Sequence, residues 1–273
     1  MAASIDNLVN VNFIKGDIDL LNFGLMLGGS GQHKPFPFSP ARLFDNGEQG
    51  AWYLIRPQLL FQDAAGTVPV TTDGDPVGRM LDQSGNGYHA IQTVSGQRFV
   101  YRTDGTLHWL EGDGVDDFLQ NTTVNFVMAT SSTLVAGRQN VTGVQGIFKA
   151  GNASLASVDE YILIRPSSTS DANTSTTASP YAFSVNANTN FLTELHHNST
   201  KLDYVLDGSI VNSASVSFGS IAVTHGIVLL ASLPALQYWD GRFYGAILRT
   251  PEMTAEDKTS SRQYLANLSG VTL

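Results

Sequence analysis

Short runs of alternating apolar and polar residues fill the chain from Gly50 onward. Segments rich in Val, Ile, Phe, Tyr and Thr are interrupted about every 8 to 12 residues by Gly, Asn, Asp or Pro, a spacing typical of a β-sandwich. The predicted strands are 117–125, 133–138, 146–149, 160–165, 181–186, 191–196, 201–206, 209–216, 226–232 and 241–249. The last two are more continuously apolar, which indicates strands with both faces covered.

Two of these strands are joined by a recognisable turn. Asp207-Gly208 lies between segments 201–206 and 209–216. This dipeptide supplies the positive φ angles of a two-residue type I′ turn. We therefore predict a tight antiparallel hairpin here.

The C-terminal segment carries the signals of one short helix. Thr254 can accept hydrogen bonds from the first-turn amides of Glu256 and Asp257, and Gly270 can end the helix. The apolar face of this helix comprises Tyr264, Leu265 and Leu268. We expect it to pack on the sandwich.

Segment 167–179 lacks the apolar pattern of a strand or helix. It reads SSTSDANTSTTAS and contains small, mostly polar residues of low complexity. We predict an exposed loop between two strands, which is either a contact for a partner or a solvated edge.

The first 45 residues differ in pattern from the rest. Apolar residues recur near a helical period, Gly28 to Gly31 then interrupts any helix, and the prolines of 34–40 favour an extended chain. We predict an anchoring arm with a Pro/Gly linker over 1–45 and a β-sandwich domain over 46–273. The arm would dock on another protein through Ile14, Ile18, Leu21, Phe23, Leu25, Met26, Phe36 and Phe38. The alternative is a terminal segment that folds back onto its own domain.

Composition and charge narrow the function classes. The chain has 273 residues and a net charge of −9, which argues against binding nucleic acid or anionic lipid. It has no cysteine, so disulfides, thiol catalysis and cysteine-ligated metals are excluded. The N-terminus lacks the basic start and apolar run of a secretory signal, and no segment is apolar enough for membrane insertion. We expect synthesis in a host cytoplasm.

Three motifs in order resemble the laminin-G-like or concanavalin-A-like lectin domains of bacterial surface and phage structural proteins. They are 78–90 (GRMLDQSGNGYHA), 112–119 (GDGVDDFL) and 239–248 (WDGRFYGAIL). The resemblance covers about residues 50 to 273 and implies an all-β fold, a two-sheet antiparallel jelly-roll sandwich. The opening run 50–53 (GAWY) is also similar to phage versions of the domain.

The first motif makes physical sense as a turn. Asp82 and Asn86 can bind local amides, while Gly85 and Gly87 can adopt angles closed to other residues. Its oxygen side chains also fit the first half of a calcium loop, but Thr93 stands where a bidentate Glu is needed. We predict no metal and no cofactor.

A second acidic cluster comprises Asp113, Asp116 and Asp117. Some members of the resembling family bind calcium at such a cluster. Capping the start of the following strand is the role that we favour for it.

A search for catalytic patterns names no catalytic residue. Glu111 to Asp116 superficially fits the E-x-D-x-x-E strand of laminarinase-type glycosidases, but its last acid is Asp and its two glycines would break a strand. His196 and His197 would point to opposite faces of a strand and cannot share a metal, so we expect one half-buried and one exposed ring. The prediction is that the chain is not an enzyme.

The best ligand-binding candidates are Tyr238, Trp239 and Asp240, because sugars stack on exposed aromatics beside polar side chains. Large aromatics at strand ends more often complete a core, which is the competing interpretation. Trp52 and Trp109 are predicted to be core residues.

The leading hypothesis is a bacteriophage virion structural protein, either a tail fibre or tail-tip subunit or a capsid decoration protein. It would be a homo-trimer that contacts other virion proteins through its arm, and its lectin-like domain would serve assembly and adhesion to host surface glycans. The alternative is a carbohydrate-active enzyme or a carbohydrate-binding module.

Overall fold

The computed structural model describes residues 38–141, 145–151, 161–164, 170–174, 177–181, 186–198, 200–215, 221–223, 226–229, 231–232 and 237–273. Seven of the eight predicted anchoring residues, Ile14 to Phe36, lie outside these ranges. Within them, no helix combines the length and the apolar character that crossing a lipid bilayer requires.

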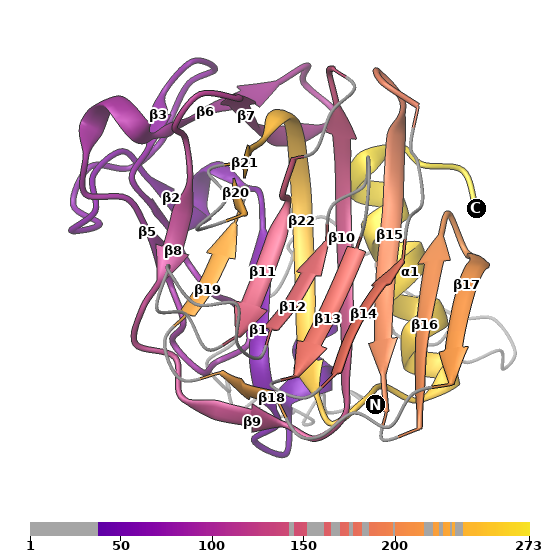
Figure 1. Ribbon diagram of the computed structural model, residues 1–273. Coiled ribbons are helices and arrows are strands. Elements are labelled where there is room, and N and C mark those ends of the chain that lie inside the picture. Colours follow the sequence, from indigo (N-terminus) through magenta and orange to yellow (C-terminus); the bar gives the residue numbers. More distant parts are fainter. Residues whose placement is uncertain are drawn as a thin grey trace, which may run out of the picture. The chain divides into compact units, whose positions relative to one another are not determined.

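Two antiparallel sheets make up most of the described chain (Figure 1). The first sheet has the spatial order β17 (Ser209–Ser215), β16 (Lys201–Leu206), β15 (Asn190–His197), β10 (Ser131–Gln139), β22 (Asp240–Thr250), β7 (His108–Asp113), β6 (Phe99–Thr103) and β3 (Pro76–Val77), with β1 (Gln49–Leu54) also paired to β22. The second sheet has the order β14 (Thr177–Tyr181), β13 (Ser170–Thr174), β12 (Tyr161–Ile164), β11 (Phe148–Gly151), β19 (Gly226–Leu229), β8 (Leu119–Asn121), β5 (Ala90–Ile91), β4 (Arg79–Met80) and β2 (Leu60–Phe61).

Smaller elements complete the described fold. Two short pairs join β18 (Ile221–Val223) to β9 (Phe126–Met128) and β20 (Ala231–Ser232) to β21 (Gln237–Tyr238). The 3₁₀ turns are η2 (Pro40–Phe44), η3 (Pro57–Leu59) and η4 (Ser95–Gln97), and the helix is α1 (Ala255–Ser269).

The main core lies between the two sheets. Alternate residues of their strands point inward, and the largest of them, such as Phe99, Phe148 and Phe243, are 0% exposed. One continuous cluster contains residues of both sheets. The predicted all-β, two-sheet antiparallel sandwich is confirmed.

A second apolar cluster lies on the outer face of the first sheet, the face turned away from the second sheet. There α1 packs against β10, β22 and β15 (Figure 1). Leu265 of the helix is 0% exposed, and Trp52 meets the Tyr264 ring edge-on at 6.0 Å between ring centroids. Trp52 and Trp109 are buried as predicted, but they belong to this outer cluster.

The helix has the predicted ends. The Thr254 side chain accepts a hydrogen bond from the amide of Asp257 at 3.1 Å, and Gly270 ends the helix with a φ of 72°. Phe38, predicted as part of the arm, lies against this helix, with its ring centroid 6.4 Å from that of Tyr264.

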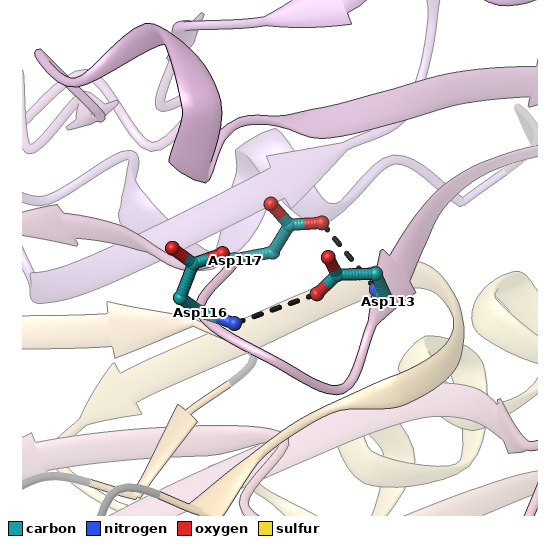
Figure 2. Close-up of side chains that lie close together, drawn as sticks. All are labelled: Asp113, Asp116 and Asp117. Carbon is teal, nitrogen blue, oxygen red and sulfur yellow. Dashed lines mark hydrogen bonds between the residues drawn. The ribbon is translucent and has the colours of Figure 1, made fainter.

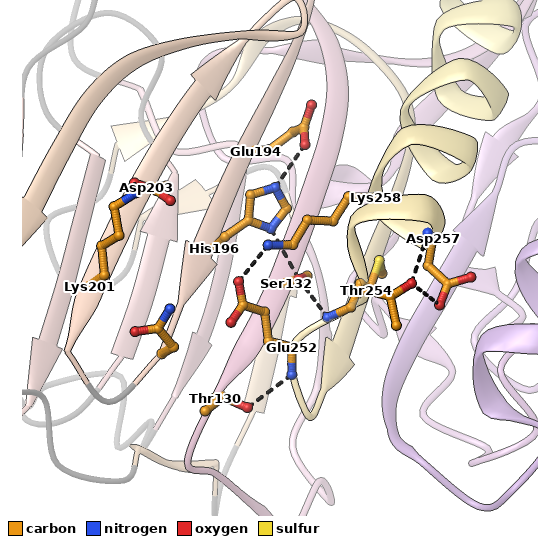
Figure 3. A network of polar contacts seen from close by, with 12 residues as sticks. Thr130, Ser132, Glu194, His196, Lys201, Asp203, Glu252, Thr254, Asp257 and Lys258 are labelled. Atoms are coloured by element: carbon orange, nitrogen blue, oxygen red, sulfur yellow. Dashed lines mark hydrogen bonds and ion pairs between the residues drawn. The ribbon is translucent and has the colours of Figure 1, made fainter.

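Polar side chains also hold the helix to the sheet (Figure 3). Glu194 on β15 is 0% exposed and accepts hydrogen bonds from Arg262 of α1 and from His196 Nε2 at 2.8 Å. Burial acts to raise the pKa of Glu194, but these two donors outweigh it and the pKa is lowered. At the start of the helix, the amide of Met253 donates to the Ser132 hydroxyl at 3.0 Å.

The predicted hairpin is confirmed. Strand β16 spans the predicted 201–206, and the turn residues Asp207 and Gly208 have φ angles of 46° and 81°. Of the strand predicted over 181–186, residues 182–185 lie outside the described residues; Tyr181 is the last residue of β14, and Asn186 lies outside any strand.

Two other predictions are wrong. The segment 167–179, predicted as a loop, contains β13 and most of β14, because its backbone groups pair with β12 and with each other at the sheet edge. His196 and His197 are both buried, at 4% and 0% exposure, because β15 is an interior strand and α1 packs on the outer face of its sheet.

Candidate functional site

A row of polar side chains crosses the outer face of the first sheet beside the C-terminal end of α1. Its members are Glu111 on β7, Arg242 on β22, Arg138 on β10 and Asn190 on β15. Each is the register partner of the next. Directly opposite residues on neighbouring strands project from the same face of a sheet and contact one another. We call these four residues the outer row.

Local packing fixes the direction in which the row points. At Gly137, an added Cβ would lie 2.5 Å from the Ile147 side chain, so this residue faces the core between the sheets. Arg138 follows it and therefore faces outward. On β22, Phe243 belongs to the inner cluster and Tyr244 to the outer one, which places Arg242 outward as well.

Aromatic rings form the floor next to the row. The Arg242 guanidinium carbon lies 4.1 Å from the centroid of the Trp109 ring, and the Tyr244 ring is tilted against Trp109 at 6.3 Å. The Tyr244 hydroxyl donates to Asn190 Oδ1 at 3.1 Å, and the Trp109 indole N–H donates to Glu111. These contacts hold the polar ends of the row in fixed orientations.

A carboxylate pair flanks one amide at the edge of the row. Asn140 Nδ2 donates to Glu111 Oε1 and to Asp240 Oδ1, each at 3.1 Å. Glu111 also faces Arg242, whose Nε is 3.6 Å from Glu111 Oε2. Two carboxylates close together are the groups that glycosidases use for acid–base and nucleophilic chemistry, and Glu111 and Asp240 form such a pair around Asn140.

An open hollow of about 460 Å³ adjoins the other end of the row. It is lined by Arg138, Asn188, Thr189, Asn190, Asp207, Gly270, Val271 and Thr272. Asn188 has a φ of 62°, accepts a hydrogen bond from Arg138 Nη2 at 3.1 Å and donates to the Asn140 carbonyl at 3.3 Å. Burial raises the pKa of Asp207, whose Oδ1 accepts the Leu192 amide at 2.8 Å.

Only one of the three residues predicted to bind a ligand lies at this site. Asp240 joins it through Asn140. Trp239 is 0% exposed and packs against Phe191 in the core, so it presents no face on which a sugar could stack. Tyr238 is half-buried beside Phe118, with 6.4 Å between the ring centroids. For Trp239 the competing core interpretation describes the observed position.

The GDGVDD motif is a turn that follows a strand (Figure 2). The amides of Val115 and Asp116 donate to Asp113 Oδ1, and the Asp113 amide donates to Asp117 Oδ2 at 3.4 Å. Burial, and then the Asp113 charge, raise the pKa of Asp117 to about 7. Contrary to the prediction that glycine would break the strand, β7 runs through Gly112, where a Cβ would lie 2.3 Å from the Trp239 carbonyl oxygen.

The same three aspartates are the described carboxylates that could hold a divalent cation. One ligand atom from each of Asp113, Asp116 and Asp117 lies within 4.8 Å of the others. Carboxylate oxygens are the ligands that calcium prefers. The hydrogen bonds from the loop's own amides also account for their arrangement.

The DQSGNG motif is the predicted turn. Asp82 Oδ1 accepts the amides of Trp52 and Ser84, each at 2.9 Å, so the turn is tied to β1. Gly85 and Gly87 have φ angles of 89° and 77°. The side-chain amide of Asn86 donates through Nδ2 to the Gly50 carbonyl at 2.9 Å. These bonds give the motif a structural role.

No protein-family model matches the sequence, and no curated protein sequence matches it. Solved structures do match the fold. Domain 4 of a GH43 extracellular arabinanase from Geobacillus stearothermophilus, in complex with arabinotriose, has a TM-score of 0.51 and 9% identity, covering 81% of this chain and 100% of that one. A GH54 α-L-arabinofuranosidase has a TM-score of 0.56 and 10% identity, covering 85% of this chain and 66% of that one. The binding domain of botulinum neurotoxin serotype G has a TM-score of 0.50 and 12% identity, covering 68% of this chain and 49% of that one.

These likenesses concern the fold, and they correct one prediction. The chain was predicted not to be an enzyme, but a glycoside hydrolase shares its β-sandwich. That prediction no longer stands. At 10% identity the likeness places no catalytic residue in this chain, so its chemistry has to be argued from the outer row itself.

Proposed function

We propose that this chain is a carbohydrate-active β-sandwich that binds a glycan along the outer row. The observation that carries the proposal is the unbroken register Glu111–Arg242–Arg138–Asn190 beside the Trp109 and Tyr244 rings. Carboxylate, guanidinium and amide groups together offer both acceptors and donors to sugar hydroxyls. Because the row lies on paired strands, its groups are held before a ligand arrives.

The solved structures that share the fold support a glycan as the ligand. The arabinanase domain was solved with arabinotriose, and the GH54 enzyme is an arabinofuranosidase. The Glu111–Asp240 pair, whose two carboxylates share the Asn140 amide, supports an enzyme that hydrolyses glycans at the same site. Binding module and enzyme therefore make different predictions for one surface.

Binding is tested by calorimetry with a panel of plant and bacterial oligosaccharides that includes arabinotriose. We expect Asn140→Ala to weaken binding about tenfold, because it removes the donor that positions two acceptors. Asn198→Ala, just after the far end of β15, is the matched control and should bind as the parent does. A folded parent that binds no glycan of the panel would contradict the proposal.

Hydrolysis is tested on the same panel by following new reducing ends. If the site is catalytic, both Glu111→Gln and Asp240→Asn lose turnover by 100-fold or more, which is on the order of a general acid–base contribution. Binding without turnover in the parent identifies a binding module.

We also propose the virion role as a second function, supported by the order of the three motifs at 78–90, 112–119 and 239–248. In this proposal the arm over 1–45 attaches a homo-trimer to other virion proteins. Co-sedimentation of the chain with phage particles, with and without residues 1–45, tests it. Particle binding that persists without the arm would contradict the anchoring role, and light scattering would report the oligomer.

A further inference from the structure

Two arginines stand directly opposite each other in the middle of the outer row. Arg138 on β10 is the register partner of Arg242 on β22. Like charges at directly opposite positions of a sheet destabilise it, so this arrangement has a cost in the free protein. The chain as a whole has a net charge of −9, which makes two adjacent cations on one face a specific local feature.

The two arginines differ in how their charges are balanced. Arg242 stacks on Trp109 and faces Glu111. Arg138 forms no ion pair with any residue that the structure describes. Its Nη2 donates to the neutral Asn188 at 3.1 Å. The buried Nε atoms of both arginines have no hydrogen-bond partner, so the difference between the two lies in the stacking and the carboxylate that only Arg242 has. Because Arg138 is paired with no described carboxylate, an incoming anionic group that reaches its guanidinium would form charge-assisted hydrogen bonds without displacing an ion pair.

The hollow beside Arg138 provides space for such an acceptor. Asp207 is the one carboxyl group among the described residues that line it; its Oδ1 accepts the Leu192 amide, and burial raises its pKa, which reduces its negative charge. The remaining polar side chains of the hollow are neutral, among them Asn188 and Asn190. A negatively charged group in the hollow would therefore meet the Arg138 guanidinium and two amides.

We propose that Arg138, with the charge of Arg242 on the neighbouring strand, binds the carboxylate of an acidic sugar, so that the glycan taken by this site contains uronic acid. This inference rests on the proposed function and specifies its ligand. A guanidinium presents a planar fork that matches the two oxygens of a carboxylate, and charge-assisted hydrogen bonds of this kind are about twice as strong as neutral ones. Asn190 and Asn188 then remain for the hydroxyls of the same or the next ring.

Matched ligands test the charge directly. Oligogalacturonides and glucuronic-acid-substituted xylo-oligosaccharides are compared with their own methyl esters, which keep the sugar ring and remove the charge. Arabinotriose is included as a neutral ligand. We expect each acid that binds to do so at least tenfold more tightly than its ester, with the difference falling at high salt.

Matched variants locate the effect. Arg138→Gln should weaken the binding of each acid about tenfold more than it weakens the binding of the corresponding ester, so that most of the preference for acid over ester is lost. Arg42→Gln removes the same charge near the N-terminal end of α1, where Arg42 pairs with Asp257, and should keep the preference. Thermal unfolding of each variant confirms that it is folded.

The outcomes separate the two proposals. If the parent prefers acids and Arg138→Gln loses that preference, the uronate site is supported. If the parent binds acids and esters equally, or binds arabinotriose more tightly than every acid, the uronate site is overturned and glycan binding stands. If the folded parent binds no glycan, both proposals are overturned.

Discussion

Asp117 is a carboxyl group whose titration is set by its surroundings. It is 5% exposed and lies beside Asp113 and Asp116, and its pKa is raised to about 7. The folded state therefore holds this proton more tightly than the unfolded chain, whose ordinary pKa is 3.8. The contribution to stability is complete below pH 3.8 and is lost as the pH rises through about 7.

We accordingly expect Asp117→Asn to be more stable than the parent at pH 8, by about 1–3 kcal/mol, and to differ less at pH 5. Denaturant unfolding at the two pH values measures this difference. Asp45→Asn, an exposed position, is the control for a general charge effect. A parent and an Asp117→Asn variant with parallel pH profiles would show that the carboxyl group is ionised throughout.

Glu194 illustrates the reverse case. Because its pKa is lowered, its stabilising contribution is present above the ordinary value of 4.5 and is lost as the pH falls through the folded-state value. Replacing the carboxylate by an amide removes the charge that faces Arg262 and leaves one acceptor oxygen where Arg262 and His196 use two. We expect Glu194→Gln to lower the free energy of unfolding by about 3–5 kcal/mol at pH 7.

The surface pair Lys201–Asp203 is a suitable comparison. Lys201 Nζ and Asp203 Oδ1 are 2.8 Å apart, but the Lys201 side chain is 45% exposed. Asp203→Asn should cost about 0–1 kcal/mol in the same denaturant experiment. Equal costs for Glu194→Gln and Asp203→Asn would mean that the buried network does not hold the helix to the sheet.

At the scale of elements, α1 depends on its ends as well as on its buried face. Thr254→Ala removes the side chain that accepts the Asp257 amide. We expect a loss of about 1 kcal/mol in the free energy of unfolding, as is typical for an N-cap. Thr259→Ala, an exposed position within the helix, should cost less. The unfolding midpoints of the two variants measure this difference, and equal losses would show that the Thr254 side chain does not stabilise the start of the helix.

How far the sequence predicts the elements depends on how local the signal is. The 201–206 strand and the Asp207-Gly208 turn could be predicted because alternation and turn chemistry are encoded in adjacent residues. The hairpin of β13 and β14 could not, because its polar residues have no apolar pattern and only pairing with β12 makes them strands.

The site is harder to predict than the elements. Arg138 and Arg242 become neighbours only through the register of β10 with β22, between positions far apart in the chain. Trp239 was a plausible ligand residue because its burial depends on the facing sheet. The one usable signal was the pair of polar residues Asp240 and Arg242 at alternate positions, just before the largely apolar stretch 243–248 of the same strand.

At the scale of the whole molecule, the described sandwich has its own core from Phe38 to the C-terminal helix. We expect a chain that starts at Phe38 to unfold with the same midpoint as the full chain, because the two apolar clusters remain complete. Calorimetric unfolding of the two chains measures this. A midpoint lowered by several degrees would instead favour an N-terminal segment that folds back onto the domain.

The position of Gly270, Val271 and Thr272 in the wall of the hollow has a practical consequence. A purification tag or biosensor tether fused after Leu273 would begin two residues from that wall. Sensor chips that capture the protein by this terminus would shield the recess and understate affinity. Capture through surface amines well away from it, such as Lys201, avoids the artefact.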